Sequence, residues 1–325
     1  MPQVIAPGIF QITLPTPFPV GDVHAYLLWG EPLTLVDTGL NWPPGRERLV
    51  AELAAIGVGL ADLEQIVISH SHLDHFGLAR TCQAAGRGTV LAHPLACAKL
   101  ADLQGYVETA LAWSATVLAE TGLPAEKHGW VKAFYGIIPQ WAEEVVVDRC
   151  INEGQTLRAG GSDWEVFFFP GHSGDLIALY RAEDGLLLGS DHLLAHISSN
   201  ALLEPPHQET GCRRLPLIEY WRSLERLETL SIRRILPGHG AVITDVVGLL
   251  AERRQRRDRR LADIAAFVAT TPRTVWEIAQ ALFPNLSHTD IFLAISEVIG
   301  HLDILKRDGV VREHKEGNLY LYSRF

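Results

Sequence analysis

Short apolar runs along the chain alternate with polar turns that contain histidine or aspartate. The clearest runs are residues 66–68, 167–169, 186–188 and 235–236, and a histidine or aspartate follows each of them within a few residues. Apolar runs of this length that end at glycine, proline or serine are typical of buried strands. If these strands share one core and end at a common edge, the polar side chains that follow them gather at that edge.

One pair of runs supports this geometry. Residues 176–181 and 186–189 are predicted to form two strands joined by a turn that contains Glu183-Asp184-Gly185. The first strand leaves the edge near His172, and its partner returns to the same edge at Asp191. We therefore expect His172 and Asp191 to lie close together.

A helical insertion is predicted over residues 94–149, between His72 and His172. Apolar positions spaced by three and four indicate one amphipathic helix over 103–118, and a second amphipathic stretch covers 127–142. An insertion at this point is well placed to roof the edge and shape a substrate pocket. The alternative is that its aromatic residues only attach it to the core; these are Trp113, Trp130, Tyr135 and Trp141.

The segment 246–325 is predicted to be a separate small domain. A long arginine-rich helix is followed by helices over 274–283 and 289–307, the second of which ends at Gly309. Residues 310–313 and 319–322 then form a hairpin around 315–318. The order helix, helix, hairpin resembles a winged helix, and we interpret this segment as a structural or dimerisation element, so a homodimer is an open hypothesis.

The densest chemical signal lies at the end of the first run, where His70, His72, Asp74 and His75 fall within six residues. Three imidazoles and a carboxylate this close together form a ligand set for a transition metal. His70 and His72 are two residues apart, so an extended backbone directs both rings to one side. A polar loop that happens to contain histidines is the alternative, and the density at a strand end favours the metal site.

With a lone histidine, a lone aspartate and a last histidine following in this order, the pattern resembles the signature of the metallo-β-lactamase-fold hydrolases. The resemblance spans roughly residues 8–245 and includes the segment Leu35-Val36-Asp37-Thr38-Gly39. It implies an α/β fold, the αββα sandwich, with residues 1–245 as the catalytic domain. It also implies two divalent ions, zinc first with manganese or iron as alternatives. The implied ligands are His70, His72 and His172 for one ion, Asp74, His75 and His239 for the other, and Asp191 between them.

The resemblance implies a hydrolase in which a hydroxide that bridges the two metals attacks the substrate, while Asp74 orients the nucleophile and shuttles a proton. We expect a small ester, thioester or lactone as substrate, as in the glyoxalase II-like hydroxyacylglutathione hydrolases. The alternative enzyme is a phosphodiesterase or endoribonuclease of the same fold that binds its substrate with the winged-helix-like segment. A non-catalytic binding protein predicts a defective metal site, and the intact set of ligands argues against it.

Two further histidines are candidate catalytic residues. His192 and His196 follow Asp191 closely, so either ring could donate a hydrogen bond to a developing oxyanion or a proton to a leaving group. His24 and His207 are left open, because loop histidines without a role are common.

Charge and composition restrict the partners. Residues 251–325 hold 12 Lys and Arg against 10 Asp and Glu, which leaves 16 against 28 for the rest, so the predicted catalytic part is acidic. A nucleic-acid channel is strongly basic, so nucleic acid is an unlikely partner. The N-terminus has no basic start or long apolar core, and no apolar stretch approaches a membrane span. The four cysteines include no Cys-x-x-Cys pair, and together these features favour a reduced, cytoplasmic protein.

Overall fold

Two facing β-sheets form the centre of the molecule. The structure is a computed structural model that describes residues 1–206 and 211–325, so His207 lies outside the described residues. Within these ranges one sheet has the order β1-β2-β3-β4-β5-β6-β7 and the other has the order β12-β11-β10-β9-β8. The first contains β1 (Gln3–Ala6), β2 (Ile9–Leu14), β3 (Val23–Leu28), β4 (Thr34–Val36), β5 (Gln65–Val67), β6 (Thr89–Ala92) and β7 (Arg149–Cys150). The second contains β8 (Thr156–Ala159), β9 (Ser162–Phe168), β10 (Ile177–Arg181), β11 (Leu186–Ser190) and β12 (Arg234–Pro237).

Strand side chains alternate between two cores and thereby produce the layered architecture. Val36 and Val67 face the second sheet and pack in one cluster with Trp164 and Leu188, whereas Leu35 belongs to the cluster on the opposite face. Helices cover both outer faces, with α1 (Pro43–Ala54) and α3 (Ala79–Ala85) on the first sheet and α8 (Pro216–Leu227) on the second. The result is the αββα sandwich that the sequence predicted.

The strands that precede the histidine and aspartate turns end at one edge of the sandwich. β4 and β5 are parallel, and so are β11 and β12, so each pair delivers its following residues to one side. The hairpin of β10 and β11 is antiparallel with Leu179 opposite Leu188, as predicted. At this edge the amide of Ile177 donates to the carbonyl of Ser69 over 2.8 Å, which joins the two sheets.

The insertion is helical, with one difference from the prediction. It contains α4 (Pro94–Ala101), α5 (Leu103–Glu120), the short turn η2 (Ala125–Lys127), α6 (His128–Gly136) and α7 (Ile138–Trp141). The second amphipathic stretch, expected as one unit over 127–142, is divided after Gly136. Pro139 explains the break, because its ring removes a backbone N–H and is tolerated only in the first turn of a helix.

The C-terminal segment contains the expected helices and hairpin, together with one strand that the sequence did not reveal. Its elements are α9 (Val246–Phe267), β13 (Arg273–Thr274), α10 (Val275–Leu282), η3 (His288–Asp290), α11 (Ile291–Arg307), β14 (Val311–Glu316) and β15 (Leu319–Arg324). The two-residue β13 pairs with β15 and extends the hairpin to a sheet of order β13-β15-β14. A two-residue strand is too short to leave a periodic pattern, which is why no sequence signal marked it.

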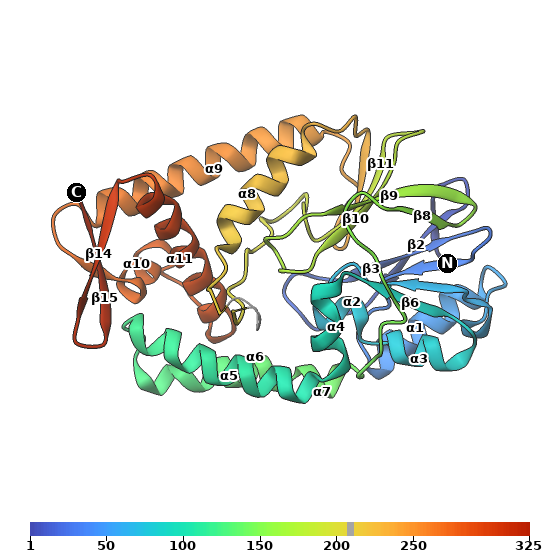
Figure 1. The fold of residues 1–325 in the computed structure, drawn as a ribbon, viewed down its shortest axis with the longest axis horizontal. Helices are drawn as coiled ribbons and strands as arrows, with labels where there is room; N and C mark the ends of the chain where they lie inside the picture. The colour runs from blue at the N-terminus through green and yellow to red at the C-terminus, as the bar shows by residue number, and fades with distance from the viewer. Residues whose placement is uncertain (207–210) are drawn as a thin grey trace.

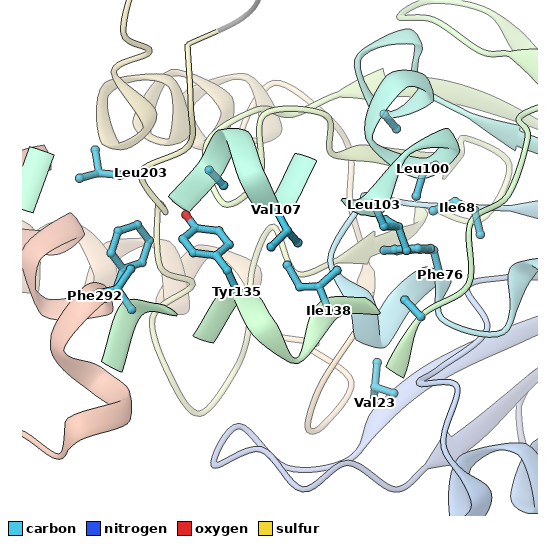
Figure 2. Close-up of a cluster of buried hydrophobic side chains, with 14 of the residues drawn as sticks. Val23, Ile68, Phe76, Leu100, Leu103, Val107, Tyr135, Ile138, Leu203 and Phe292 are labelled. Atoms are coloured by element: carbon cyan, nitrogen blue, oxygen red, sulfur yellow. The ribbon is translucent and has the colours of Figure 1, made fainter. Parts of the chain in front are cut away.

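The C-terminal segment packs directly on the insertion. Figure 1 shows the sheets at one end of the long axis, the C-terminal elements at the other, and α5 and α6 running between them. The rings of Tyr135 on α6 and Phe292 on α11 lie 5.8 Å apart, and the amide of Trp276 donates to the carbonyl of Thr121. Figure 2 shows the buried side chains continuing from Phe292 through Tyr135 and Val107 towards Phe76, and all four belong to one hydrophobic cluster. The boundary at residue 246 therefore separates elements that share one hydrophobic cluster, and it stays a prediction as a domain boundary.

Candidate metal centre

Three imidazole nitrogens meet at the edge of the sandwich. Nε2 of His70 lies 3.0 Å from Nδ1 of His72, which in turn lies 3.0 Å from Nε2 of His172. His70 and His72 follow β5, with extended backbone at His72, while His172 enters from the loop after β9. The two sheets therefore contribute jointly to the cluster, as the sequence predicted from the apolar runs.

A second cluster lies beside the first and contains carboxylates. Oδ2 of Asp74 lies 3.4 Å from Nε2 of His239, and Oδ1 of Asp74 lies 4.0 Å from Nε2 of His75. Asp191 contacts both clusters, with Oδ1 3.5 Å from Nε2 of His75 and Oδ2 3.6 Å from Nε2 of His172. The sequence-predicted ligands thus lie in one place, with Asp191 between the two groups of histidines.

Hydrogen bonds to the outer ring nitrogens direct the inner nitrogens into the centre. Nδ1 of His75 donates to Asp37 over 2.8 Å, Nδ1 of His172 to the carbonyl of Asn200 over 2.9 Å, and Nδ1 of His239 to the carbonyl of Asp22 over 2.8 Å. Each bond places a ring proton on Nδ1 and directs Nε2 inward. This arrangement orients the three rings towards a shared centre.

The donor set fits divalent cations. Nε2 of His75 and Oδ1 of Asp191 are buried and have no hydrogen-bond partner among the described residues, although they lie only 3.5 Å apart. Buried polar atoms are costly without a partner, and a cation between them would satisfy both. Nitrogens bound to a tetrahedral zinc at about 2.0–2.1 Å lie about 3.3 Å from one another, close to the separations between His70, His72 and His172.

Burial and charge give the two clusters different protonation. Burial lowers the pKa of His70 and His72 well below the ordinary value, so both rings are neutral lone-pair donors at neutral pH. Burial raises the pKa of Asp74, but the neighbouring His75 and His239 outweigh this effect and hold the pKa of the carboxyl at about 2. Asp74 is therefore a carboxylate at neutral pH.

Asp37 is a further candidate for a functional residue, and the sequence did not reveal its place at the site. Its carboxylate accepts hydrogen bonds from the amide and hydroxyl of Ser69 and from Nδ1 of His75. Asp37 and Ser190 are the non-glycine residues with positive φ, 61° and 46°, among those described. Asp37 directly follows β4, and Ser190 is the last residue of β11. A strained backbone of this kind is concentrated at functional positions. The segment 35–39 signalled the family, but only the fold places Asp37 behind His75.

The candidate catalytic histidines differ in their surroundings. The ring of His192 is fully buried, stacks on Phe169 at 4.6 Å and meets Tyr220 edge-on, so it packs as a core side chain. The ring of His196 is exposed and lies against Gly240, directly after His239, where a side chain on Gly240 would collide with it. Of the two, only His196 lies open to solvent beside the cluster.

His24, left open by the sequence, is buried on β3. Its Nε2 donates to the carbonyl of Gly240 over 2.8 Å, and its Nδ1 accepts from the hydroxyl of Thr13 over 3.1 Å. This position supports the turn that carries His239 instead of facing the ligands.

Helix α9 holds the loop that carries His196. The buried guanidinium of Arg253 donates through Nη2 to the carbonyls of Leu194 and Ile197, at 2.9 and 3.0 Å. Hydrogen bonds from a charged donor to buried carbonyls are among the stronger ones in proteins. The arginine-rich helix therefore contributes one buried arginine to the loop beside the centre.

Lys99, from α4 of the insertion, approaches the centre from the other side. Its ammonium lies over the ring of Tyr106 at 4.4 Å and has no carboxylate within ion-pair distance among the described residues. Burial lowers the pKa of Lys99, while the nearby Glu204 and Asp175 raise it. The charge of Lys99 in turn lowers the pKa of His70 and of His72. The insertion therefore brings a partly buried cation and an aromatic ring towards the histidines, beyond its packing role.

The geometry agrees with the comparison with known proteins. The model of the metallo-β-lactamase superfamily matches residues 18–239. The chain belongs to the metallo-β-lactamase superfamily. The probable metallo-hydrolase YqjP of Bacillus subtilis strain 168 is 34% identical over 315 residues, which cover 97% of each protein. The crystal structure of the metallo-β-lactamase family protein TTHA1429 from Thermus thermophilus matches with a TM-score of 0.83 at 28% identity, over 99% of this chain and 100% of that one.

The matches to YqjP and to TTHA1429 cover 97% and 99% of this chain, so they extend beyond residue 246 and include the C-terminal segment. A shorter match of 30% identity over 166 residues, 47% of each protein, is to an atrochrysone carboxyl ACP thioesterase of Aspergillus fumigatus. Among the helices of the described ranges, none combines the length and apolar character needed to cross a bilayer.

Proposed function

We propose that the protein is a dinuclear metal-dependent hydrolase that acts on a small ester, thioester or lactone. The observation that carries the proposal is the convergence of the seven sequence-predicted ligands, with Asp191 in contact with both clusters. We assign one ion to His70, His72 and His172 and the other to Asp74, His75 and His239. Zinc suits these nitrogen and oxygen donors best, and manganese or iron is the alternative.

Two bound divalent ions would supply a hydroxide at neutral pH and polarise the substrate carbonyl. The protein's own residues then position the reaction. Asp74 is a carboxylate with one oxygen towards His75 and one towards His239, so it can accept the proton of the attacking water and return it to the leaving group. His196 can donate a hydrogen bond to the substrate from the rim, whereas the buried His192 is not carried into the mechanism.

The substrate class is supported by the walls around the centre. α4 and α5 bring Lys99 and Tyr106 towards His70 and His72, which favours a small molecule with a carbonyl or carboxylate group over a bulky polymer. The thioesterase named among the relatives supports a thioester, and a glyoxalase II-like substrate is one member of that class. Net charge supports the same choice, because the part of the chain outside residues 251–325 holds 16 basic against 28 acidic residues.

One preparation tests the proposal. Protein purified without chelator is expected to contain about two metal ions per chain by elemental analysis, and Asp74→Ala is expected to lose metal and turnover together. A panel of thioesters, lactones and aryl esters is assayed beside single-stranded RNA and a bis-aryl phosphodiester. His196→Ala is expected to keep its metal but change rate or substrate preference, whereas the matched control His314→Ala, in the distant hairpin, is expected to change neither.

Only trace metal in the purified protein would contradict the dinuclear assignment. Metal-dependent RNA cleavage that weakens steeply with salt, without ester turnover, would replace the proposed substrate class by nucleic acid. Activity on the small phosphodiester alone would leave the ester assignment without support, since it would show the centre attacking phosphorus and not carbon.

A further inference from the structure

Two cysteines from opposite ends of the insertion meet on the surface of the catalytic part. Sγ of Cys97, on α4, lies 3.2 Å from Sγ of Cys150, on β7, although 53 positions separate them in the sequence. The contact follows from the fold, because Cys150 pairs with Ala92 at the end of β6, just before the turn into α4. Both sulfurs belong to free thiols.

We propose that Cys97 and Cys150 form a thiol-oxidation site that closes to a reversible disulfide when a hydroperoxide reaches Cys150. The sulfurs are already in van der Waals contact, so closing a bond of about 2.05 Å requires only a small movement of the two side chains. Cys150 is exposed and Cys97 is half-buried, so an oxidant reaches Cys150 first. This inference does not depend on the substrate of the metal centre.

The chemistry divides between the two residues. The thiolate of Cys150 attacks a peroxide oxygen, the O–O bond breaks, and Cys150 becomes a sulfenic acid while hydroxide leaves. The thiol of Cys97 then gives up its proton and attacks the Cys150 sulfur, which forms the S–S bond and releases water. In total, two thiols and one hydrogen peroxide give one disulfide and two waters, so the peroxide accepts the two electrons that the sulfurs lose.

Local surroundings fit these roles. Burial, and then contact with Cys150, raises the pKa of Cys97 to about 11, so Cys97 stays protonated until Cys150 is activated. Cys82 is buried, with its pKa raised to about 12, and is shielded from both steps. Cys212 is exposed but contacts no other cysteine among the described residues, so it cannot form the same product.

The crosslink would tie the start of the insertion to its end. The closed loop contains α5, α6 and α7, and α4 carries Lys99 two residues after Cys97. A crosslink over so long a loop restricts the unfolded chain strongly. The oxidised protein is therefore expected to show a Tm higher by several degrees and slower proteolysis within residues 103–142.

The experiment uses the full-length protein and hydrogen peroxide in stoichiometric amount. The free thiols, counted after unfolding in denaturant, are expected to fall from four to two and to return to four with dithiothreitol. Peptide mapping is expected to find Cys97 joined to Cys150. In Cys97→Ser the sulfenic acid of Cys150 has no resolving thiol, so dimedone labelling of Cys150 is expected to rise several-fold over the parent protein.

Cys212→Ser is the matched control, because it removes an exposed cysteine outside the pair and is expected to behave as the parent protein does. A thiol count that stays at four, a disulfide that includes Cys212, or dimedone labelling of Cys150 that is equal in the parent and in Cys97→Ser would each overturn the proposal. A disulfide that forms without any change in Tm or proteolysis would overturn the inferred constraint on the insertion.

Discussion

Asp37 is not itself a predicted ligand, yet it contacts two residues of the candidate metal centre. Its carboxylate accepts three hydrogen bonds, from the amide and hydroxyl of Ser69 and from Nδ1 of His75. These contacts fix the residue before His70 and the tautomer of His75 at the same time. A carboxylate is required here because each of its partners is a donor in this arrangement.

The first prediction concerns this residue. In Asp37→Asn one carboxylate oxygen becomes an NH₂ group that faces a donor, so either Ser69 or His75 loses its acceptor. We expect metal affinity to fall by about 10- to 100-fold, measured by competition with a chelator, while circular dichroism stays unchanged. Asp22→Asn is the matched control, since the exposed Asp22 supports His239 through its backbone carbonyl only. Unchanged affinity in a folded Asp37→Asn would show that the hydrogen bonds of Asp37 do not govern metal binding.

At the scale of elements, α11 is a helix that the surrounding helices bury along most of its length. Its apolar positions pack on α8, α9 and α10, and even His301 is only 3% exposed. Nδ1 of His301 donates to the carbonyl of Glu297, while Arg257 and Arg260 of α9 face the ring. Burial lowers the pKa of His301. The two arginines also lower this pKa, whereas Glu297 raises it.

Stability is predicted to depend on pH through this histidine. Because the pKa of His301 is lower in the folded than in the unfolded chain, the unfolded chain binds the proton first as pH falls below about 6.5, and stability is lost in that range. We expect the decrease in Tm between about pH 7.5 and about pH 5.5 to be smaller in His301→Gln than in the parent protein. His314→Gln, in the exposed hairpin, serves as the control. An equal decrease in all three proteins would contradict the prediction.

At the scale of the whole molecule, the insertion and the C-terminal segment stabilise each other. Phe292 of α11 is 2% exposed and packs in the cluster that contains Tyr135 and Val107 of the insertion (Figure 2). Neither part covers its apolar face alone, so the chain is expected to unfold in one cooperative transition in spite of its length.

The corresponding prediction is that Phe292→Ala destabilises the whole protein by about 3–5 kcal/mol, through lost burial and the cavity that remains. Urea unfolding followed by fluorescence and by circular dichroism measures the change, and the two signals are expected to coincide. Phe325→Ala is the matched control, because Phe325 is 74% exposed. Two separate transitions, with only the C-terminal one shifted, would instead show that residues 246–325 fold as an independent domain.

The sequence alone predicted the candidate ligands, the strands that deliver them and the helices of the insertion and C-terminal segment. These features are local: His70 and His72 share one extended segment, and amphipathic helices and glycine-bounded strands leave periodic patterns within a few residues. The order of the ligands also carried the family resemblance, which the comparison confirmed over residues 18–239.

Tertiary structure decided what depends on contacts between distant segments. It placed Asp37 behind His75, directed Arg253 to the loop of His196, buried His192 in the core, and brought Cys97 to Cys150. None of these pairings has a period or a spacing in the chain, because each arises where two separately formed elements meet. For the same reason the sequence pointed to the candidate metal ligands, while only the fold revealed the residues that orient, support and enclose them.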